Sequence, residues 1–132
     1  MKKIILDTNF LLMPLQFRVD IFSEFDRICN FNYKLFIFDK SIGELKNIIK
    51  KQSQKHKKAA EFALKLIKLK NISIIQSNQE DVDSLILKNI NKDTIIATQD
   101  SLLKKELLKK GISVIILRQK KYLQFVKNHN YI

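Results

Sequence analysis

In the stretch Lys3-Ile4-Ile5-Leu6-Asp7-Thr8-Asn9, the short apolar run Ile4–Leu6 is followed by three polar residues, with no turn signal between the two parts. An apolar run of this length is typical of a central parallel strand that is buried on both faces of its sheet. In open α/β sheets, functional residues gather just beyond the carboxyl ends of such strands. Asp7 is therefore the first candidate functional residue of the chain.

Apolar strand patterns alternate with helical patterns along the rest of the chain. We expect further strands at residues 35–38, 72–75, 94–98 and 113–117, and helices at 9–16, 20–30, 41–51, 57–70, 80–87 and 101–110. The basic tail after Arg118 is expected to form a short helix. Alternation of this kind predicts an α/β fold, a three-layer α/β/α sandwich with a central, mostly parallel five-stranded sheet.

Composition indicates one globular unit. The 132 residues are 45% hydrophobic and 29% charged, and two Gly and one Pro leave no flexible linker, so we expect a single domain over residues 1–132. The single Cys29 is expected to be a buried thiol in a reducing cytoplasm. Asp7 ends the first apolar run too early for a signal peptide, and no run is long enough to span a membrane. We therefore expect a soluble, cytoplasmic protein.

The chain is strongly basic, with 25 Lys and Arg against 13 Asp and Glu and a net charge of +12. Much of the excess falls in residues 50–58, 104–110 and 118–127. Such an excess favours a nucleic-acid partner, whose phosphates the cations would neutralise. A lysine-rich composition also arises from an A/T-rich genome or from thermophily, so charge alone leaves these alternatives open.

Three further acids are expected at the same sheet edge as Asp7. Asp100 follows a strand, and Glu44 and Asp83 lie in the first turns of helices that follow loops. Four like charges at one edge would repel each other unless a cation joined them, and oxygen ligands without a His or Cys cluster indicate Mg²⁺ or Mn²⁺. Helix capping is the alternative for each acid, and Ser41-Ile42-Gly43-Glu44 in particular fits a capping box.

Four motifs in order resemble a PIN-domain ribonuclease over essentially the whole chain. They are Ile5–Asn9, Ser41–Leu45, Val82–Ile86 and Ile96–Asp100. Four other segments resemble one branch of that family, the archaeal relatives of the Fcf-type small-subunit rRNA-processing proteins. These segments are Met13–Phe17, Val19–Phe22, Thr98–Asp100 and Leu117–Lys121.

The resemblance implies metal-dependent cleavage of RNA. The catalytic and metal-binding acids would be Asp7, Glu44, Asp83 and Asp100, supported by Thr8, Asn9 and Thr98. Asp83 is preferred to its acidic neighbours because Ile86 fits the family's Asp-x-x-Ile register. The cations expected to hold RNA phosphates are Lys50, Lys51, Lys55, Lys57, Arg118, Lys120 and Lys121. Tyr122 or Phe125 would either stack on an unpaired base or, as we favour, pack in the core.

The resemblance leaves more than one biological role open. Maturation of an rRNA precursor, together with a ribosome-assembly partner, is the first. A toxin-type PIN ribonuclease of the VapC kind, restrained by an antitoxin and working as a homodimer, is the second. A non-catalytic RNA-binding module in ribosome assembly is the third, although the presence of all four acids argues against it.

Overall fold

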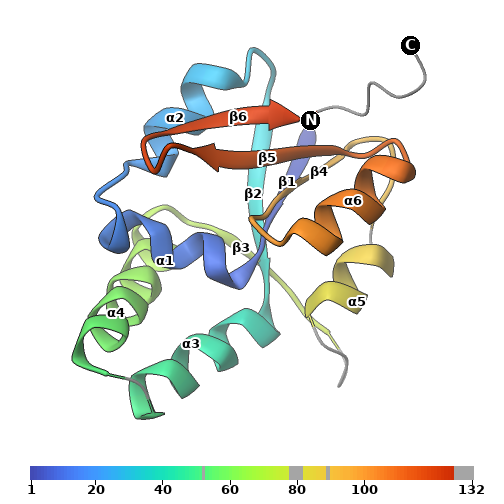
Figure 1. The fold of residues 1–132 in the computed structure, drawn as a ribbon. Helices are drawn as coiled ribbons and strands as arrows, with labels where there is room; N and C mark the ends of the chain where they lie inside the picture. The colour runs from blue at the N-terminus through green and yellow to red at the C-terminus, as the bar shows by residue number, and fades with distance from the viewer. Residues whose placement is uncertain (52, 78–81, 89, 127–132) are drawn as a thin grey trace.

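The computed structural model describes residues 1–51, 53–77, 82–88 and 90–126, and its strands form one sheet (Figure 1). The strands are β1 (Lys2–Leu6), β2 (Tyr33–Phe38), β3 (Ser73–Ile75), β4 (Thr94–Ala97), β5 (Ser113–Arg118) and β6 (Tyr122–Val126). Their order is β3-β2-β1-β4-β5-β6; β1 to β5 run parallel, and β6 pairs antiparallel with β5. The order reverses between β1 and β4, which is where doubly wound sheets place their sites.

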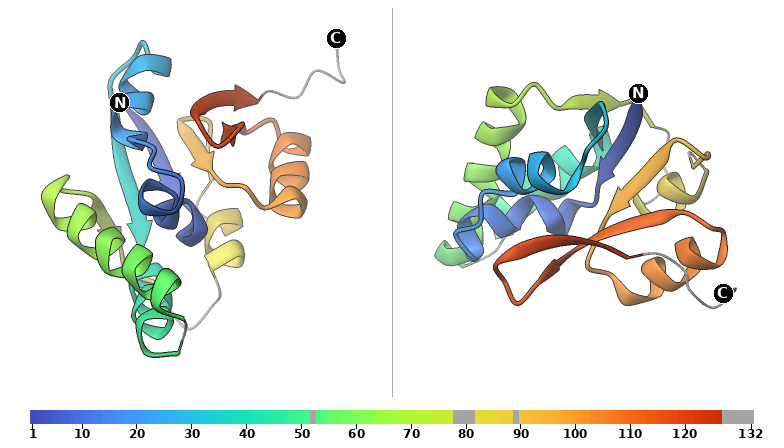
Figure 2. Two further views of the ribbon diagram at one scale, coloured as in Figure 1. Left: turned by 60° about the vertical axis from the view of Figure 1, so that its left-hand side comes forward. Right: turned by 90° about the horizontal axis from the view of Figure 1, so that it is seen from above.

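Helices cover both faces of this sheet (Figure 2). They are α1 (Thr8–Gln16), α2 (Ile21–Ile28), α3 (Asp39–Lys51), α4 (Gln54–Leu69), α5 (Val82–Lys88) and α6 (Ser101–Lys109). Buried residues of α1 to α4 pack in one core cluster, and those of α5 and α6 pack in a second. The predicted three-layer α/β/α architecture is confirmed. None of the described helices is long and apolar enough to cross a bilayer.

Strand β1 is buried on both sides, as its sequence predicts. Ile4 and Leu6 belong to the cluster with α1 to α4, Ile5 belongs to the cluster with α5 and α6, and all three are fully buried. Alternate side chains of a strand point to opposite faces, so an all-apolar strand fits only the middle layer. The chain leaves this layer at Asp7, whose position is therefore fixed by the packing of β1.

The helix ends follow local sequence signals. Asp20 caps α2 by accepting from the backbone N–H groups of Phe22 at 3.1 Å and Ser23 at 3.2 Å. Gly111, with φ of 76°, lies just after the α6 cap and takes the left-handed conformation that glycine adopts without strain. Pro14 lies inside α1, which continues to Gln16.

The tail after Arg118 is a strand, so the expected short helix is wrong and the sheet has six strands instead of five. Leu123 and Phe125 pack on the core cluster, and Gln124 between them is exposed, which is the period of a strand. The Phe125 ring lies 6.2 Å from that of Phe31. Phe125 therefore packs in the core, as favoured over base stacking.

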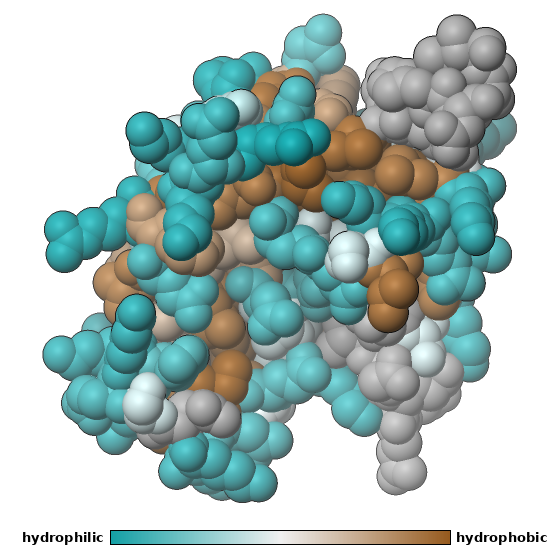
Figure 3. All heavy atoms as spheres, in the orientation of Figure 1, coloured by the Kyte–Doolittle hydropathy of each residue, from teal (hydrophilic) through white to brown (hydrophobic). Residues whose placement is uncertain are grey.

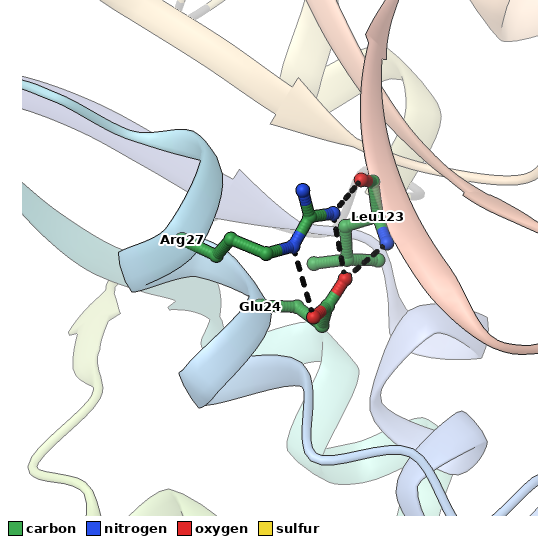
Figure 4. A network of polar contacts seen from close by, with 3 residues as sticks. All are labelled: Glu24, Arg27 and Leu123. Atoms are coloured by element: carbon green, nitrogen blue, oxygen red, sulfur yellow. Dashed lines mark hydrogen bonds and ion pairs between the residues drawn. The ribbon is translucent and has the colours of Figure 1, made fainter.

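Side chains of α2 cover the outer edge of β6 at Leu123 (Figure 4). The Leu123 N–H donates to Glu24 Oε1 at 2.9 Å, and Arg27 Nη2 donates to the Leu123 carbonyl at 2.9 Å. Arg27 also donates to both Glu24 carboxylate oxygens, at 3.1 and 2.9 Å. The pair thus occupies the backbone groups that another strand would need, which protects this rung of the sheet edge.

We expect Glu24→Ala to lower the free energy of unfolding by about 1–2 kcal/mol, because the Leu123 N–H loses its acceptor and Arg27 loses both of its bonds to the carboxylate. Urea unfolding at neutral pH measures this loss. Glu61→Ala, on the exposed surface of α4, is the matched control and should change the value by less than about 0.5 kcal/mol. Equal losses in the two variants would contradict the role assigned to the network.

The same network should depend on pH. Hydrogen bonding to Arg27 is the main factor holding the pKa of Glu24 below its usual range. A lowered pKa contributes stability that is present above the unfolded-state pKa and is lost as the pH falls through the folded-state pKa. The difference in unfolding free energy between the wild type and Glu24→Ala should therefore shrink in acid.

Candidate active site

Asp7 is buried at the point where β1 ends, with 7% of its surface exposed. Its backbone N–H donates to the Ala97 carbonyl at 3.0 Å, which continues the pairing of β1 with β4. Its carboxylate accepts from the Thr8 N–H through Oδ1 and from the Thr98 hydroxyl through Oδ2, both at 2.8 Å. Backbone and side chain together fix the orientation of this carboxylate.

The electrostatic setting of Asp7 favours a positive partner. Burial raises the pKa of Asp7 above its usual value, and the neighbouring Asp100 raises it further. The hydrogen bonds from Thr98 and Thr8 lower it but do not offset the burial. Within the described residues Asp7 forms no ion pair. A buried carboxylate without an opposite charge is costly, and a bound cation would remove that cost.

Asp100 combines a capping role with a place beside Asp7. It is the N-cap of α6, and its Oδ1 accepts from the N–H groups of Leu102 at 2.9 Å and Leu103 at 3.0 Å. Its own N–H donates to the Thr98 hydroxyl at 3.1 Å, so Thr98 connects both acids. Both cap bonds use Oδ1, and Oδ2 accepts no hydrogen bond from the described part of the chain. Capping therefore leaves a carboxylate oxygen for a ligand.

Glu44 reaches the site through Thr8. The Thr8 hydroxyl donates to Glu44 Oε1 and lies 2.7 Å from the Ser41 hydroxyl oxygen. Helix α3 begins at Asp39, which places Ser41 inside the first turn, fully buried, instead of at the N-cap. The capping-box alternative is therefore wrong, because Ser41 and Glu44 both turn toward Thr8.

Ser41 is the site residue that sequence analysis missed. The sequence favours a helix cap for its hydroxyl, but that hydroxyl forms a hydrogen bond with the Thr8 hydroxyl instead. Nothing in the local sequence separates this role from a helix cap. Asp39 precedes Ser41 and follows β2 directly, as Asp7 follows β1. Asp39 accepts from the Lys40 N–H at 2.9 Å and from the hydroxyl of Ser77, which follows β3. That hydroxyl bond is the main factor lowering the pKa of Asp39.

The structure does not bring the remaining predicted site residues, Asp83 and Asn9, into the described contacts of this group. Asp83 belongs to α5, but its side chain lies outside the described part of the structure, as do Glu80 and Asp81 entirely. Asn9 is exposed on α1 and has no hydrogen bond to the acids within the described residues. Among the described side chains, no three of His, Cys, Asp or Glu gather closely enough to hold a metal ion.

The candidate phosphate-binding cations lie in two separate places, the α3–α4 junction and the β5–β6 turn. Lys50 and Lys51 end α3 and Lys55 and Lys57 begin α4, where Figure 3 shows hydrophilic side chains at the lower left. Lys51 is twelve residues along α3 from Asp39, about 18 Å at the α-helical rise. The β5–β6 turn carries Arg118, Lys120 and Lys121, all exposed. Lys120 Nζ lies 5.3 Å from the centre of the Phe17 ring.

Other chemistries find no support in the described residues. Burial raises the pKa of Cys29 to about 11, so the thiol stays protonated and buried in the core, as expected. His56 is exposed on α4 and contacts the Ser53 hydroxyl at 2.9 Å, whereas His129 lies outside the described residues. The edge of the sheet where Asp7 and Asp100 follow β1 and β4, the acidic edge, is therefore the strongest candidate site.

Comparison with known families settles the kind of domain. The PIN like domain family matches residues 4–120, which include both strand ends that form the acidic edge. This chain belongs to the PIN-like domain family. The resemblance drawn from the four motifs is confirmed.

Relatives of this PIN-like domain match nearly all of it. It is 32% identical over 126 residues to Ribonuclease VapC4 of Methanocaldococcus jannaschii, covering 94% of this chain and 96% of the relative. Among solved structures, the PIN domain endonuclease Utp24 matches with a TM-score of 0.77 and 21% identity over 95% of this chain and 91% of that one. A domain of a functionally unknown protein from Methanocaldococcus jannaschii matches with a TM-score of 0.55 and 17% identity over 89% and 92%. Both structural matches share the fold.

Thr98→Val should raise the pKa of Asp7 in the PIN-like domain, because it removes a hydrogen bond that favours the ionised carboxylate. It should also cost about 1–3 kcal/mol of stability, since Asp7 Oδ2 and the Asp100 N–H lose their partner. Titration of the Asp7 carboxyl carbon by NMR measures the pKa.

Thr94→Val is the matched control for this titration. Thr94 is also buried, but its hydroxyl bonds only to Asn91 among the described residues. It should lower stability to a similar extent and leave the pKa of Asp7 in place. An Asp7 pKa that does not move in Thr98→Val would show that the hydroxyl does not hold the carboxylate.

Proposed function

We propose that this chain is a metal-dependent endoribonuclease that hydrolyses phosphodiester bonds of RNA. The observation that carries the proposal is the buried Asp7 carboxylate at the point where the strand order reverses, held by Thr98 and adjacent to Asp100. The relationship to Ribonuclease VapC4 over nearly the whole chain supports RNA as the substrate.

The donor set fits Mg²⁺ or Mn²⁺. Carboxylate oxygens are the ligands that these hard cations prefer, and Asp7 is buried without an ion pair among the described residues. The residues that would hold the metal are Asp7, Asp83, Asp100 and Glu44. When bound, the ion would lower the pKa of a water and neutralise charge on the phosphate.

The residues around these acids would orient them and bind the substrate. Thr98 holds Asp7 and the backbone of Asp100, and Thr8 holds Glu44, so these hydroxyls fix where each carboxylate faces. Asn9, which is exposed beside Thr8, is available to contact the substrate. The lysines of the α3–α4 junction and of the β5–β6 turn would bind RNA phosphates on two sides of the acidic edge.

The proposed role is maturation of an rRNA precursor in the cytoplasm, with ribosome-assembly proteins as partners. It rests on the Fcf-like segments such as Leu117–Lys121. The similarity to Ribonuclease VapC4 favours a second candidate, a toxin-type ribonuclease with an antitoxin partner, acting as a homodimer. Preferential cleavage of rRNA precursor fragments over generic RNA would support the first role. Equal cleavage, together with an antitoxin gene beside this one, would support the second.

Asp7→Asn should abolish Mn²⁺-dependent cleavage of single-stranded RNA, with a loss of at least about a hundredfold, because it removes the central carboxylate. Asp20→Asn is the matched control. Position 20 lies outside the acidic edge, and asparagine caps a helix as well as aspartate does. It should cleave RNA like the wild type. Undiminished cleavage by purified Asp7→Asn would refute the assignment, and binding without cleavage by the wild type would indicate the non-catalytic module.

Metal should stabilise the wild type through Asp7. The pKa of Asp7 is raised, so its contribution to stability is present below the unfolded-state pKa and lost as the pH rises through the folded-state pKa. At neutral pH and in a chelator, Asp7→Asn should therefore unfold at the same temperature as the wild type or higher. Mn²⁺ should raise the melting temperature of the wild type by about 2–5 °C and leave that of Asp7→Asn unchanged. Equal shifts in both would place the metal elsewhere.

A further inference from the structure

Gln99 lies between two residues of the acidic edge, and its side chain points away from them to strand β5. Its Oε1 accepts from the Leu117 N–H at 2.6 Å, and its Nε2 donates to the Leu117 carbonyl at 3.2 Å. One amide side chain thus binds both backbone groups of a single strand residue.

The contact extends the pairing of β4 and β5 beyond the last backbone pair. That pair is Ala97 with Ile115, followed by one hydrogen bond from the Thr98 N–H to the Ile115 carbonyl at 3.1 Å. The chain then turns away at Asp100, the N-cap of α6. The Gln99 amide, with one donor and one acceptor, takes the place of the strand residue that is missing opposite Leu117.

Leu117 leads directly into the basic turn between β5 and β6. The turn closes with a hydrogen bond from the Lys121 N–H to the Arg118 carbonyl at 2.9 Å. Gln119 and Lys120 have φ of 52° and 56°, a left-handed conformation that costs about 1 kcal/mol or more for residues other than glycine. The pairing of β5 with β6 and contacts outside the turn offset this cost.

Three contacts hold the turn from different sides. Lys120 lies over the Phe17 ring at the end of α1, and Arg118 Nε donates to Gln124 Oε1 at 2.9 Å. Gln99 holds the strand that enters the turn, and it alone belongs to the segment that carries Thr98 and Asp100. Gln99 therefore connects the strand that enters the basic turn with the segment that carries the acids.

We propose that Gln99 is a positioning residue that fixes the basic turn Arg118–Lys121 relative to Asp7 and Asp100. RNA whose phosphates are bound by the turn is then held at one fixed position relative to the acids. This inference rests on the proposed ribonuclease function. It assigns to Gln99 an effect on substrate placement that acts through Lys120 and Lys121, not a contact with the reacting atoms.

The test is a double-mutant cycle between Gln99 and the turn, with Mn²⁺-dependent cleavage of a single-stranded RNA as the readout. Gln99→Met keeps the length of the side chain and removes both hydrogen bonds. It should raise KM by about three- to tenfold, with a smaller change in kcat, and weaken the salt dependence of KM. Gln99→Asn, one methylene shorter, should behave like Gln99→Met because it cannot reach Leu117.

The cycle then separates positioning from a purely structural role. In a background carrying Lys120→Gln and Lys121→Gln, the further change Gln99→Met should raise KM by less than about twofold, because the cations it places are gone. Thermal unfolding of each variant reports stability separately. A fully additive effect on KM, or an unchanged KM and salt dependence in Gln99→Met, would overturn the inference.

The parent enzyme distinguishes the two possible failures. Cleavage by the wild type and its loss in Asp7→Asn, together with an additive cycle, would leave the proposed function standing and refute the positioning role alone. Absence of cleavage by the wild type would refute the proposed function and this inference with it.

Discussion

The hydrogen bond from Thr98 to Asp7 joins the ends of β1 and β4, and the candidate site depends on it. Strand β1 is buried on both faces, so the residue that ends it is forced into a poorly solvated position. A carboxylate there needs donors and, if it is to stay ionised, a positive charge. Thr98 supplies a donor, holds the backbone of Asp100 through the same oxygen, and thereby brings two acids to one place. The charge that remains unmatched at Asp7 is the physical reason for proposing a cation.

Much of the fold follows from the sequence because its strands are apolar runs buried in a middle layer. The order of elements from β1 to β5 agrees with prediction, and the cap at Asp20 and the stop at Gly111 lie where their residue types indicate. Strand β6 was missed for a physical reason. Its turn places Gln119 and Lys120 in the left-handed region, where glycine or asparagine is the usual signal. Tertiary contacts, above all those of Glu24 and Arg27 with the Leu123 backbone, stabilise β6 although the local sequence does not predict it.

Some residues of the candidate site could likewise be predicted from the sequence, and others could not. Asp7 and Asp100 could be predicted because the carboxyl ends of neighbouring parallel strands must meet at one edge. Ser41 and Glu44 could not be separated from a capping box by sequence alone, since only the packing of α3 turns them toward Thr8. Gln99 was beyond prediction because its contact depends on the register of β4 against β5. The role of Asp83 stays a prediction, since its side chain lies outside the described residues.

The central claim is that the buried carboxylate of Asp7 is completed by a divalent cation. Titration of Asp7 by NMR, with and without Mg²⁺ at millimolar concentration, tests it most directly. We expect a pKa above the usual value for aspartate without the ion and well below it with the ion, because a bound cation favours the charged form. A pKa of Asp7 that is the same with and without Mg²⁺ and Mn²⁺ would contradict the account.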